Sequence, residues 1–595
     1  MPLPRGCSSP PQFVRCIVLA RSFLRSALAL LVSSLIAASP IVCAPPAHKP
    51  AFVASETPES PKADCELASA RGDIEHVIYI QFSHVHFTRD TPNVPSDVEQ
   101  MPHLLRFLEN NGTLLTNHHT APTSLPVSNA LTALTGLYTE RHASTFSSAP
   151  SYWTTSLGAS PVKSNSTLSV SEENKHAAAP WVPFTRAGCN VGVVAVAKMS
   201  LENTGKDILN IFGANSLEAA LSADPSTVMQ AVAQLQGIAI HCATGNSVCS
   251  LGIPDLLPDE PRGYQGFNVL FGHKNVTPMI SPNAPLLDLD GKAISDAKGT
   301  PGFPGFAAIS ASQSLAYVAA MQEHGVPVTF ASISDAHQTR GGTAIFGPGE
   351  AGYVAQLRMN DEAFDKFVAR LAADDINQNN TLFVVTSDEG EHFTGGVPSP
   401  ATCDGINVPC TYAKLGETLW SHSAAPEINA TFLGLVGPGI NVKGVEEDIW
   451  SDHADIRPTM MALLGLKDDY TTQGRALTEV FHEWALPKGV RESGEEFLKV
   501  AQAYKRINAP LAELGLTSLH ISNAATASDE PKHNNLEQQL VVIAALRDDL
   551  SAAMANLLNA SAFHGRPISE PEARQLVRSA NDLIEYVKLL AANGW

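Results

Sequence analysis

The stretch that decides the fold is TLFVVTSDEGEH, residues 381–392. Its first part, Leu382–Thr386, is a short, nearly continuous apolar run, which is typical of a strand buried on both faces of a sheet. A cluster of ionisable side chains follows directly, at Asp388, Glu389, Glu391 and His392. Carboxylates this close repel one another unless a cation or protons neutralise them. The segment therefore predicts a buried strand with a metal site at its carboxyl end.

Four more apolar runs of strand length occur along the chain: His76–Phe82, Val191–Ala197, Val326–Ile333 and Ala430–Val436. Stretches with helical periodicity separate them, including Met101–Asn110 and Tyr353–Ala373. Strands that alternate with helices indicate an α/β protein, and continuous apolar strands indicate a sheet covered on both faces. We therefore expect a three-layer α/β sandwich with a mostly parallel central sheet.

The first 44 residues have the composition of an export signal. Basic residues precede the apolar run SALALLVSSLIAASPIV, residues 26–42, and no acidic residue occurs before it. This pattern predicts a signal peptide over residues 1–44 and a secreted or periplasmic protein without a stable membrane span after cleavage. The alternative is an uncleaved anchor, because a run of this length lies near the lower limit for crossing a bilayer.

The rest of the chain divides by composition into three parts. Residues 45–75 are rich in Pro, Ala and Ser and predict a linker. Residues 76–484 carry the α/β pattern, with a loop-rich covering insertion expected over about 145–320. Residues 485–595 predict a helical module, with helices over Glu492–Ile507, Asn534–Ala560 and Glu570–Ala592. Ser569 and Glu572 have capping-box spacing, which sets the start of the last helix.

Overall composition limits the classes of function. The net charge is −20 and the apolar fraction is 44%. Such a chain folds rather than staying disordered, and it is not expected to bind nucleic acid, since that affinity depends on Lys and Arg.

Cysteine usage agrees with an oxidising compartment, because Cys242/Cys249 and Cys403/Cys410 each have the spacing of a short disulfide-closed loop.

Further potential ligands follow other predicted strands. His84 follows the first strand, Asp335 and His337 follow the strand ending at Ile333, and His422 precedes the strand ending at Val436. In open α/β sheets, ligands bind beyond the carboxyl ends of the strands. We therefore treat these residues as candidates for metal ligands beside Asp388 and Glu389. The alternative for any single one of them is a helix cap or a hydrogen bond within a loop.

Four segments together resemble the alkaline phosphatase superfamily, which includes phosphodiesterases, sulfatases and phosphoglycerate mutases. They are TGLYTERH (135–142), NNTLFVVTSD (379–388), GPGI (437–440) and DIRPTMMALLGL (455–466). The resemblance covers roughly residues 76–480, and the Asp388-Glu389 pair is more similar to its branch of bacterial phospholipases C and acid phosphatases. It implies an exported hydrolase of phosphate esters that uses a divalent metal, such as zinc, manganese, magnesium or calcium. In such enzymes a Ser or Thr hydroxyl held at a metal attacks phosphorus.

The sequence departs from the superfamily pattern at two positions. Ser83 and His84 stand where the first strand normally ends in a metal-binding carboxylate, and His84 could replace that ligand. Pro126 stands at the nucleophile position, so Ser124 or Ser128 is the candidate for a shifted nucleophile. The alternative makes Ser128 the N-cap of a helix over Asn129–Leu134 and Ser124 a turn residue. A catalytically silent binding protein of the same fold is therefore the competing hypothesis. Sulfatase activity ranks third, because no C/S-x-P-S-R arrangement is present.

Overall fold

The structure is a computed structural model that describes most of residues 65–592. It does not describe 1–64, 122–125, 143–151, 155–161, 165–170, 173–174, 177–179, 195–213, 229–230, 232–237, 243–252, 255–267, 272–278, 282–284, 296–308, 334–335, 337–345, 391–392, 395, 414–415, 418–428 and 593–595. The predicted signal peptide and most of the linker lie outside the described residues. So do Ser124, Asp335, His337 and His422.

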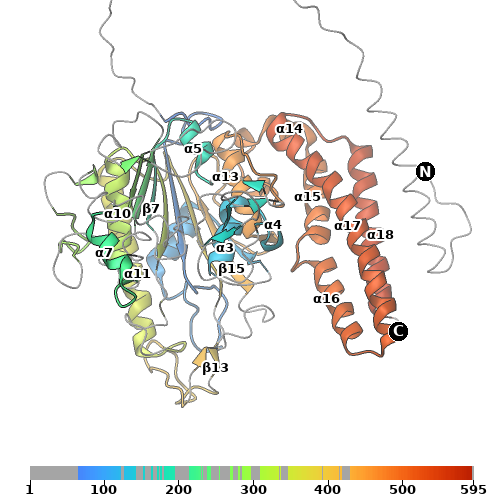
Figure 1. The fold of residues 1–595 in the computed structure, drawn as a ribbon, viewed down its shortest axis with the longest axis horizontal. Coiled ribbons are helices and arrows are strands. Elements are labelled where there is room, and N and C mark those ends of the chain that lie inside the picture. Colours follow the sequence, from blue (N-terminus) through green and yellow to red (C-terminus); the bar gives the residue numbers. More distant parts are fainter. Residues whose placement is uncertain are drawn as a thin grey trace, which may run out of the picture. The chain divides into compact units, whose positions relative to one another are not determined.

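One large sheet organises the described part of the α/β region, with strand order β16-β2-β15-β12-β1-β11-β7-β8-β10-β9 and β17 beside β2 (Figure 1). The strands that matter below are β1 (His76–Phe82), β2 (Gly112–His119), β7 (Val191–Val194), β11 (Val328–Ile333), β12 (Thr381–Ser387), β15 (Ala430–Val436) and β17 (Ser451–Asp452). The remaining strands of this sheet are β8 (Ile238–Cys242), β9 (Ile253–Pro254), β10 (Asn268–Phe271) and β16 (Gly444–Glu446). Its centre, β12-β1-β11-β7, is parallel, and the expected α/β class with a mostly parallel centre is confirmed.

Helices cover both faces of the sheet, so the fold has three layers. Along β1, Val77 and Tyr79 pack into one apolar core, whereas Ile78 and Ile80 pack into another. This alternation follows from the two-residue period of a strand. The first core contains residues of α3 (Pro126–Thr135) and α13 (Ile456–Leu464), and the second contains residues of α2 (Pro102–Asn111), α10 (Ala311–Glu323) and α11 (Ala351–Ala373).

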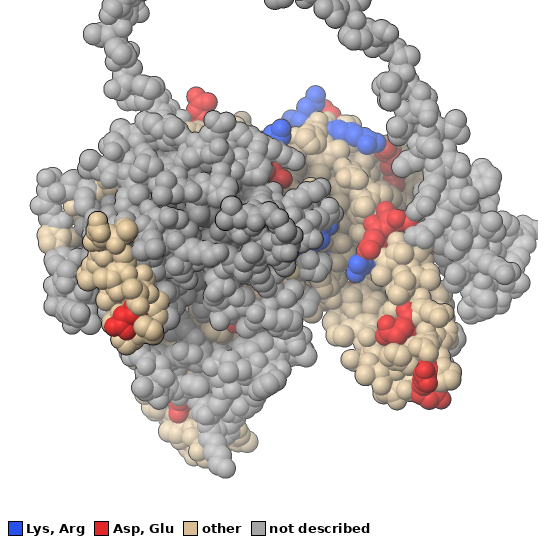
Figure 2. Space-filling view, in the orientation of Figure 1, with Lys and Arg blue, Asp and Glu red and all other residues tan. Residues whose placement is uncertain are grey.

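The C-terminal region is helical and has its own apolar core. It consists of α14 (Lys488–Ser493), α15 (Glu495–Asn508), α16 (Glu513–Thr526), α17 (Glu530–His564) and α18 (Glu570–Ala592). The boundaries of α18 agree with the sequence, and Glu572 accepts a hydrogen bond from the backbone N–H of Ser569 at 3.2 Å. On the face drawn in Figure 2, basic side chains gather near the α14 end and acidic ones lie towards the α16 end.

Three local expectations from the sequence differ from the structure. The sequence predicts no strand after the helical stretch Met101–Asn110, whereas Gly112 begins β2, which pairs with β15. The helix expected over Asn129–Leu134 begins at Pro126, because the fixed φ of proline suits a first helical residue. Ser128 is therefore inside the first turn and is not the N-cap. Finally, β7 is a strand of the large sheet and α10 packs against one face of it, although both overlap the insertion expected over about 145–320.

Two disulfides link described cysteines. Cys403–Cys410 closes a loop as the seven-residue spacing predicts, and Cys65–Cys189 joins residues separated by 124 positions. The sequence spacing had not indicated the second pair. Among the described residues, no helix is both long and apolar enough to cross a membrane.

The expected Cys242–Cys249 disulfide lies outside the described residues and remains a prediction. We expect non-reducing peptide mapping of the full chain to recover a peptide in which Cys242 and Cys249 are linked. The Cys403–Cys410 peptide provides the positive control for the same digest. Alkylated free thiols at both Cys242 and Cys249, with Cys403–Cys410 intact, would contradict this pairing.

Candidate metal site at the carboxyl edge of the sheet

Three of the predicted ligands meet at one edge of the sheet: His84 after β1, and Asp388 and Glu389 after β12. Strands β1 and β12 are parallel neighbours, with Phe82 opposite Ser387, so the residues that follow them emerge side by side. Their potential ligand atoms all lie within 4.8 Å of one another, and all three side chains are buried. In the described part of the chain, no other group of three His, Cys, Asp or Glu residues lies this close together.

The three residues also contact one another directly. His84 Nε2 lies 2.8 Å from Glu389 Oε1. The backbone N–H of His84 donates to Asp388 Oδ1 at 3.0 Å, and the N–H of Asp388 donates to the carbonyl of Phe82 at 2.9 Å. The backbone of one strand end thus orients the carboxylate of the other, across 304 positions of sequence.

The conformation of His84 is unusual for a residue with a side chain. Its φ is 57°, in the left-handed region that costs a non-glycine residue about 1–2 kcal/mol. Strain of this kind persists where the surroundings hold it, and here Ser83 Oγ lies 2.9 Å from His84 Nδ1. A metal-ligating histidine commonly has its second ring nitrogen held in this way. Ser83, at the position of the missing carboxylate, therefore acts as an orienting partner for the imidazole.

The group fits a divalent cation by its charge and its donor types. Asp388 and Glu389 are adjacent carboxylates with 0% of their surface exposed. Two buried negative charges cost several kcal/mol each unless positive charge offsets them, and the imidazole of His84 lies 2.8 Å from Glu389 Oε1. Two carboxylates and one imidazole form a donor set that suits borderline metals such as zinc.

A second layer of polar residues contacts the strand ends next to this group. The Nε2 atom of His453 lies 2.9 Å from the carbonyl oxygen of Ser387, which only accepts, so Nε2 carries the proton. The side chain of Ser387 accepts a hydrogen bond from the N–H of Val85 at 3.0 Å. The ring of His118 lies 5.2 Å from that of His453, between centroids. The sequence had not indicated His118, because β2 was not expected there.

His453 sits in a short turn, 453–455, which is held by acidic residues and by a lysine from the helical region. Tyr138 donates to Asp452 Oδ2 at 2.7 Å. Lys505, on α15, donates to Asp452 Oδ1 at 2.9 Å and to Asp455 Oδ1 at 3.0 Å. All four side chains are buried. No chemical role could be predicted for the helical module from its sequence. Its residue Lys505 nevertheless contacts the turn that lies beside the candidate metal site.

Burial lowers the pKa of three imidazoles in this layer. The pKa of His119 and that of His453 fall to about 4, and that of His118 falls well below its ordinary value. For His118 and His119 the positive charge of Lys505 adds to the effect of burial. These rings are therefore neutral at pH 7.

These shifts predict a loss of stability in acid. An unfolded histidine titrates near pH 6.5, so the unfolded chain gains protons between about pH 6.5 and pH 4 that the folded chain does not. For His119 and His453, whose pKa values are about 4, each imidazole should cost on the order of 3 kcal/mol of unfolding free energy across that range. We expect denaturant titrations to show the loss and His119→Phe, which keeps an aromatic ring against Trp450, to reduce it. An equal loss in His119→Phe and the wild type would contradict the assignment.

The pKa shift of His86 has the opposite sign, and it contributes to the same denaturant titrations. Burial lowers its pKa, but the carboxylates of Asp90 and Asp97, at 3.0 and 2.9 Å, outweigh burial and raise the pKa well above its usual value. Its contribution to stability is complete below pH 6.5 and is lost as the pH rises through the raised pKa. Because His86 is present in both proteins, its contribution cancels in the difference between His119→Phe and the wild type.

The nucleophile candidates lie on the segment that follows β2. Strand β2 pairs antiparallel with β15, which pairs antiparallel with β12, so β2 and β12 run the same way and their carboxyl ends share an edge. Helix α3 begins at this edge and packs against the turn that carries His453. Ser128, in its first turn, is fully buried. Ser124 lies outside the described residues.

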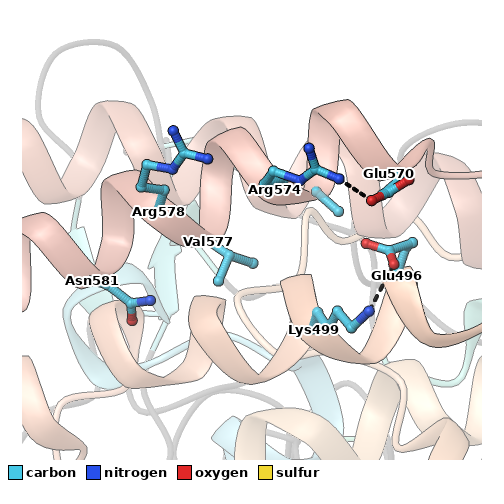
Figure 3. Close-up of a pocket in the computed structure, with 8 residues that line it drawn as sticks. Glu496, Lys499, Glu570, Arg574, Val577, Arg578 and Asn581 are labelled. Atoms are coloured by element: carbon cyan, nitrogen blue, oxygen red, sulfur yellow. Dashed lines mark hydrogen bonds and ion pairs between the residues drawn. The ribbon is translucent and has the colours of Figure 1, made fainter. Parts of the chain in front are cut away.

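A surface hollow of about 350 Å³ lies in the helical region, away from these residues (Figure 3). Helices α15 and α18 line it, and four of its charged residues form ion pairs: Glu570 with Arg574, and Glu496 with Lys499. Nothing in this lining forms a group of metal ligands. The buried group at the sheet edge is therefore the better candidate for a functional site.

Comparisons with known proteins complete the description. No family model matches the sequence, and no curated protein matches it. A matching solved structure is murine ectonucleotide pyrophosphatase/phosphodiesterase 5, at 12% identity and a TM-score of 0.36, over 68% of this chain and 100% of that chain. Another is the phosphonate monoester hydrolase of Agrobacterium radiobacter, at 15% identity and a TM-score of 0.35, over 70% and 79%.

A third match is a Bacteroides thetaiotaomicron protein of glycosaminoglycan metabolism, at 15% identity and a TM-score of 0.38, over 69% of this chain and 76% of that chain. At such identities and scores, these matches carry no residue roles over to this chain. In its three-layer α/β fold and in the order of its motifs, this chain resembles the alkaline phosphatase superfamily.

Proposed function

We propose that the protein is an exported, metal-dependent hydrolase of phosphate esters. The observation that carries the proposal is the buried group of His84, Asp388 and Glu389 at the carboxyl edge of a parallel sheet. A net charge of −20 gives the chain little general attraction for phosphate, so a cation at this edge would supply it. A divalent metal there would polarise a phosphoryl oxygen and lower the pKa of a bound hydroxyl.

Each residue of the site has a distinct part in this proposal. Asp388 and Glu389 would hold the cation through carboxylate oxygens, and His84 would bind it through Nε2. Ser83 keeps the imidazole in the required orientation through Nδ1. The group stands directly at the carboxyl ends of two strands that are buried there, so it needs little reorganisation when the cation binds.

Ser128 is the proposed nucleophile. It lies in the first turn of α3, where backbone N–H groups without helical partners can donate to phosphate oxygens. In the attack the Ser128 oxygen would form a bond to phosphorus, and the ester oxygen would leave with the electron pair of the broken P–O bond. The hydroxyl proton would pass through water to that leaving oxygen. Water would then hydrolyse the phosphoserine and release phosphate. This role for Ser128 depends on its hydroxyl being able to turn towards the sheet edge.

The second candidate function is a catalytically silent protein that binds a metal or a ligand. The observation that favours it is Pro126, which takes the nucleophile position of the superfamily motif and begins α3. Proline has no hydroxyl and cannot attack phosphorus. The hydrolase requires the cation site, whereas the silent protein could bind either a metal or another ligand, and it would show no turnover.

Two measurements on the purified exported form test the proposal. Metal analysis after dialysis should find a divalent metal bound in stoichiometric amount, and assays should find hydrolysis of an aryl phosphate monoester or diester. Hydrolysis of aryl sulfate alone would shift the substrate class to sulfate esters. Bound metal without any turnover would favour the silent protein, and no bound metal would overturn the metal-dependent hydrolase.

A further inference from the structure

The helical region reaches the α/β region through one buried charge, Lys505 on α15. Only 3% of its surface is exposed. Its ammonium group donates to Asp452 Oδ1 at 2.9 Å, to Asp455 Oδ1 at 3.0 Å and to Tyr138 OH at 3.0 Å. An ammonium group has three donors, and all three have acceptors outside the helical region.

The two aspartates that Lys505 joins determine the shape of the turn at 453–455. Asp452 Oδ1 accepts from the N–H of Ala454 at 3.1 Å, and Asp455 Oδ2 accepts from the N–H of Asp452 at 3.0 Å. Together these bonds form a reciprocal capping box. Two buried carboxylates in one turn repel each other, and an ammonium group bonded to both offsets that repulsion. Without Lys505, the turn would lose the ammonium group bonded to both carboxylates and would keep Arg475, whose backbone N–H donates to Asp455 Oδ1 at 2.8 Å.

The turn at 453–455 is itself hydrogen-bonded to the end of β12. It carries His453, whose Nε2–H donates to the carbonyl of Ser387 at 2.9 Å. Ser387 immediately precedes Asp388, and its side chain accepts from the N–H of Val85, immediately after His84. Movement of the turn would therefore be transmitted to both strand ends that carry the candidate ligands.

We propose that Lys505 is a positioning residue for the metal site, and that the helical region is thereby part of the site. Lys505 touches neither the candidate ligands nor any substrate position, and it acts through the turn and His453. The effect on metal affinity rests on the proposed function, whereas the effect on the order of the strand end does not. The inference gives the helical region a role that its sequence did not indicate.

The test compares Lys505→Met with Tyr504→Phe in the full chain. Tyr504 is the neighbouring residue of α15, and its hydroxyl donates to the carbonyl of Gln473 at 2.8 Å. Tyr504→Phe therefore removes a hydrogen bond between the same helix and the α/β region but leaves the Asp452–Asp455 turn paired. Both variants remove one polar group at this interface, so a general loss of helix docking should affect them alike.

Two readouts are measured on each variant. Competition titrations with Zn²⁺ and Mn²⁺ should show metal affinity at least tenfold weaker in Lys505→Met, because partners that orient ligands are worth about 10–100-fold. The affinity of Tyr504→Phe should stay within about threefold of the wild type. Hydrogen exchange followed by mass spectrometry should be faster over 451–455 and 385–389 in Lys505→Met only.

Two outcomes would overturn the proposal: unchanged metal affinity and exchange in Lys505→Met, or equal changes in both variants. If Lys505→Met does not fold, the double variant Lys505→Met/Asp455→Asn removes one charge of each sign and keeps an oxygen acceptor in the turn. Weakened affinity in this double variant supports the proposal, and wild-type affinity contradicts it. If the wild type binds neither ion, the proposed function fails, and hydrogen exchange alone decides the role of Lys505.

Discussion

Replacing Asp388 with Asn should lower the metal affinity of the full chain at least 100-fold while leaving the fold intact. Asp388 is fully buried beside Glu389, and an amide of the same shape removes the negative charge that a divalent cation requires. Because the loss of a residue that merely supports a ligand costs about 10–100-fold, the loss of a ligand should cost at least as much. Metal content after dialysis and competition titration measure this effect.

Asp361→Asn provides the matched control for this experiment. Asp361 is also buried, and its carboxylate accepts hydrogen bonds from the N–H groups of His103 and Leu104, at 2.8 and 3.0 Å. The same chemical change is thus made on α11, where Asp361 faces the start of α2. Wild-type metal content in Asp388→Asn, or equal loss in both variants, would place the cation elsewhere. Circular dichroism of both variants checks that the fold survives.

Ser128→Ala should reduce the turnover of an aryl phosphate by about 10⁶-fold if Ser128 is the nucleophile. Removing an activated nucleophile has an effect of that order, because only binding and electrostatic stabilisation remain. The metal content should be unchanged, since Ser128 is not among the grouped ligands. Steady-state kinetics and metal analysis on the same preparation separate the two effects.

Ser124→Ala is the comparison variant for this prediction. We expect it to retain activity within about tenfold of the wild type. If it abolishes turnover while Ser128→Ala does not, the nucleophile is Ser124 and the assignment to Ser128 is wrong. Full activity in both variants would exclude a shifted serine nucleophile altogether.

A wild type that binds metal but shows no turnover calls for a different variant. Pro126→Thr with Ser83→Asp restores the hydroxyl and the carboxylate that the superfamily motif carries. If the protein is a silent descendant of an enzyme, this double variant should gain measurable phosphatase activity over the wild type. No gain, with metal still bound, would mean that the site differs from the motif in more than these two positions.

The sequence alone determined the elements whose signals are local. Strands β1 and β15 and helix α18 have the bounds that their apolar periodicity predicts, because burial on two faces or on one stripe leaves a pattern in adjacent residues. Two of the grouped residues, Asp388 and Glu389, could be predicted as metal ligands because they directly follow a buried strand, and the structure places them in one group with His84. His84 followed from the same rule applied to β1.

Only the tertiary structure decided which distant residues meet. The Cys65–Cys189 disulfide and the hydrogen bond from His84 to Asp388 join positions 124 and 304 residues apart, and no local pattern encodes such a pairing. Lys505 is the clearest case, because a lysine in a helix is ordinarily exposed. Its burial is stable only where Asp452, Asp455 and Tyr138 surround the ammonium group. Periodicity reports whether a face is buried, whereas the partners of a buried charge depend on how separate segments pack together.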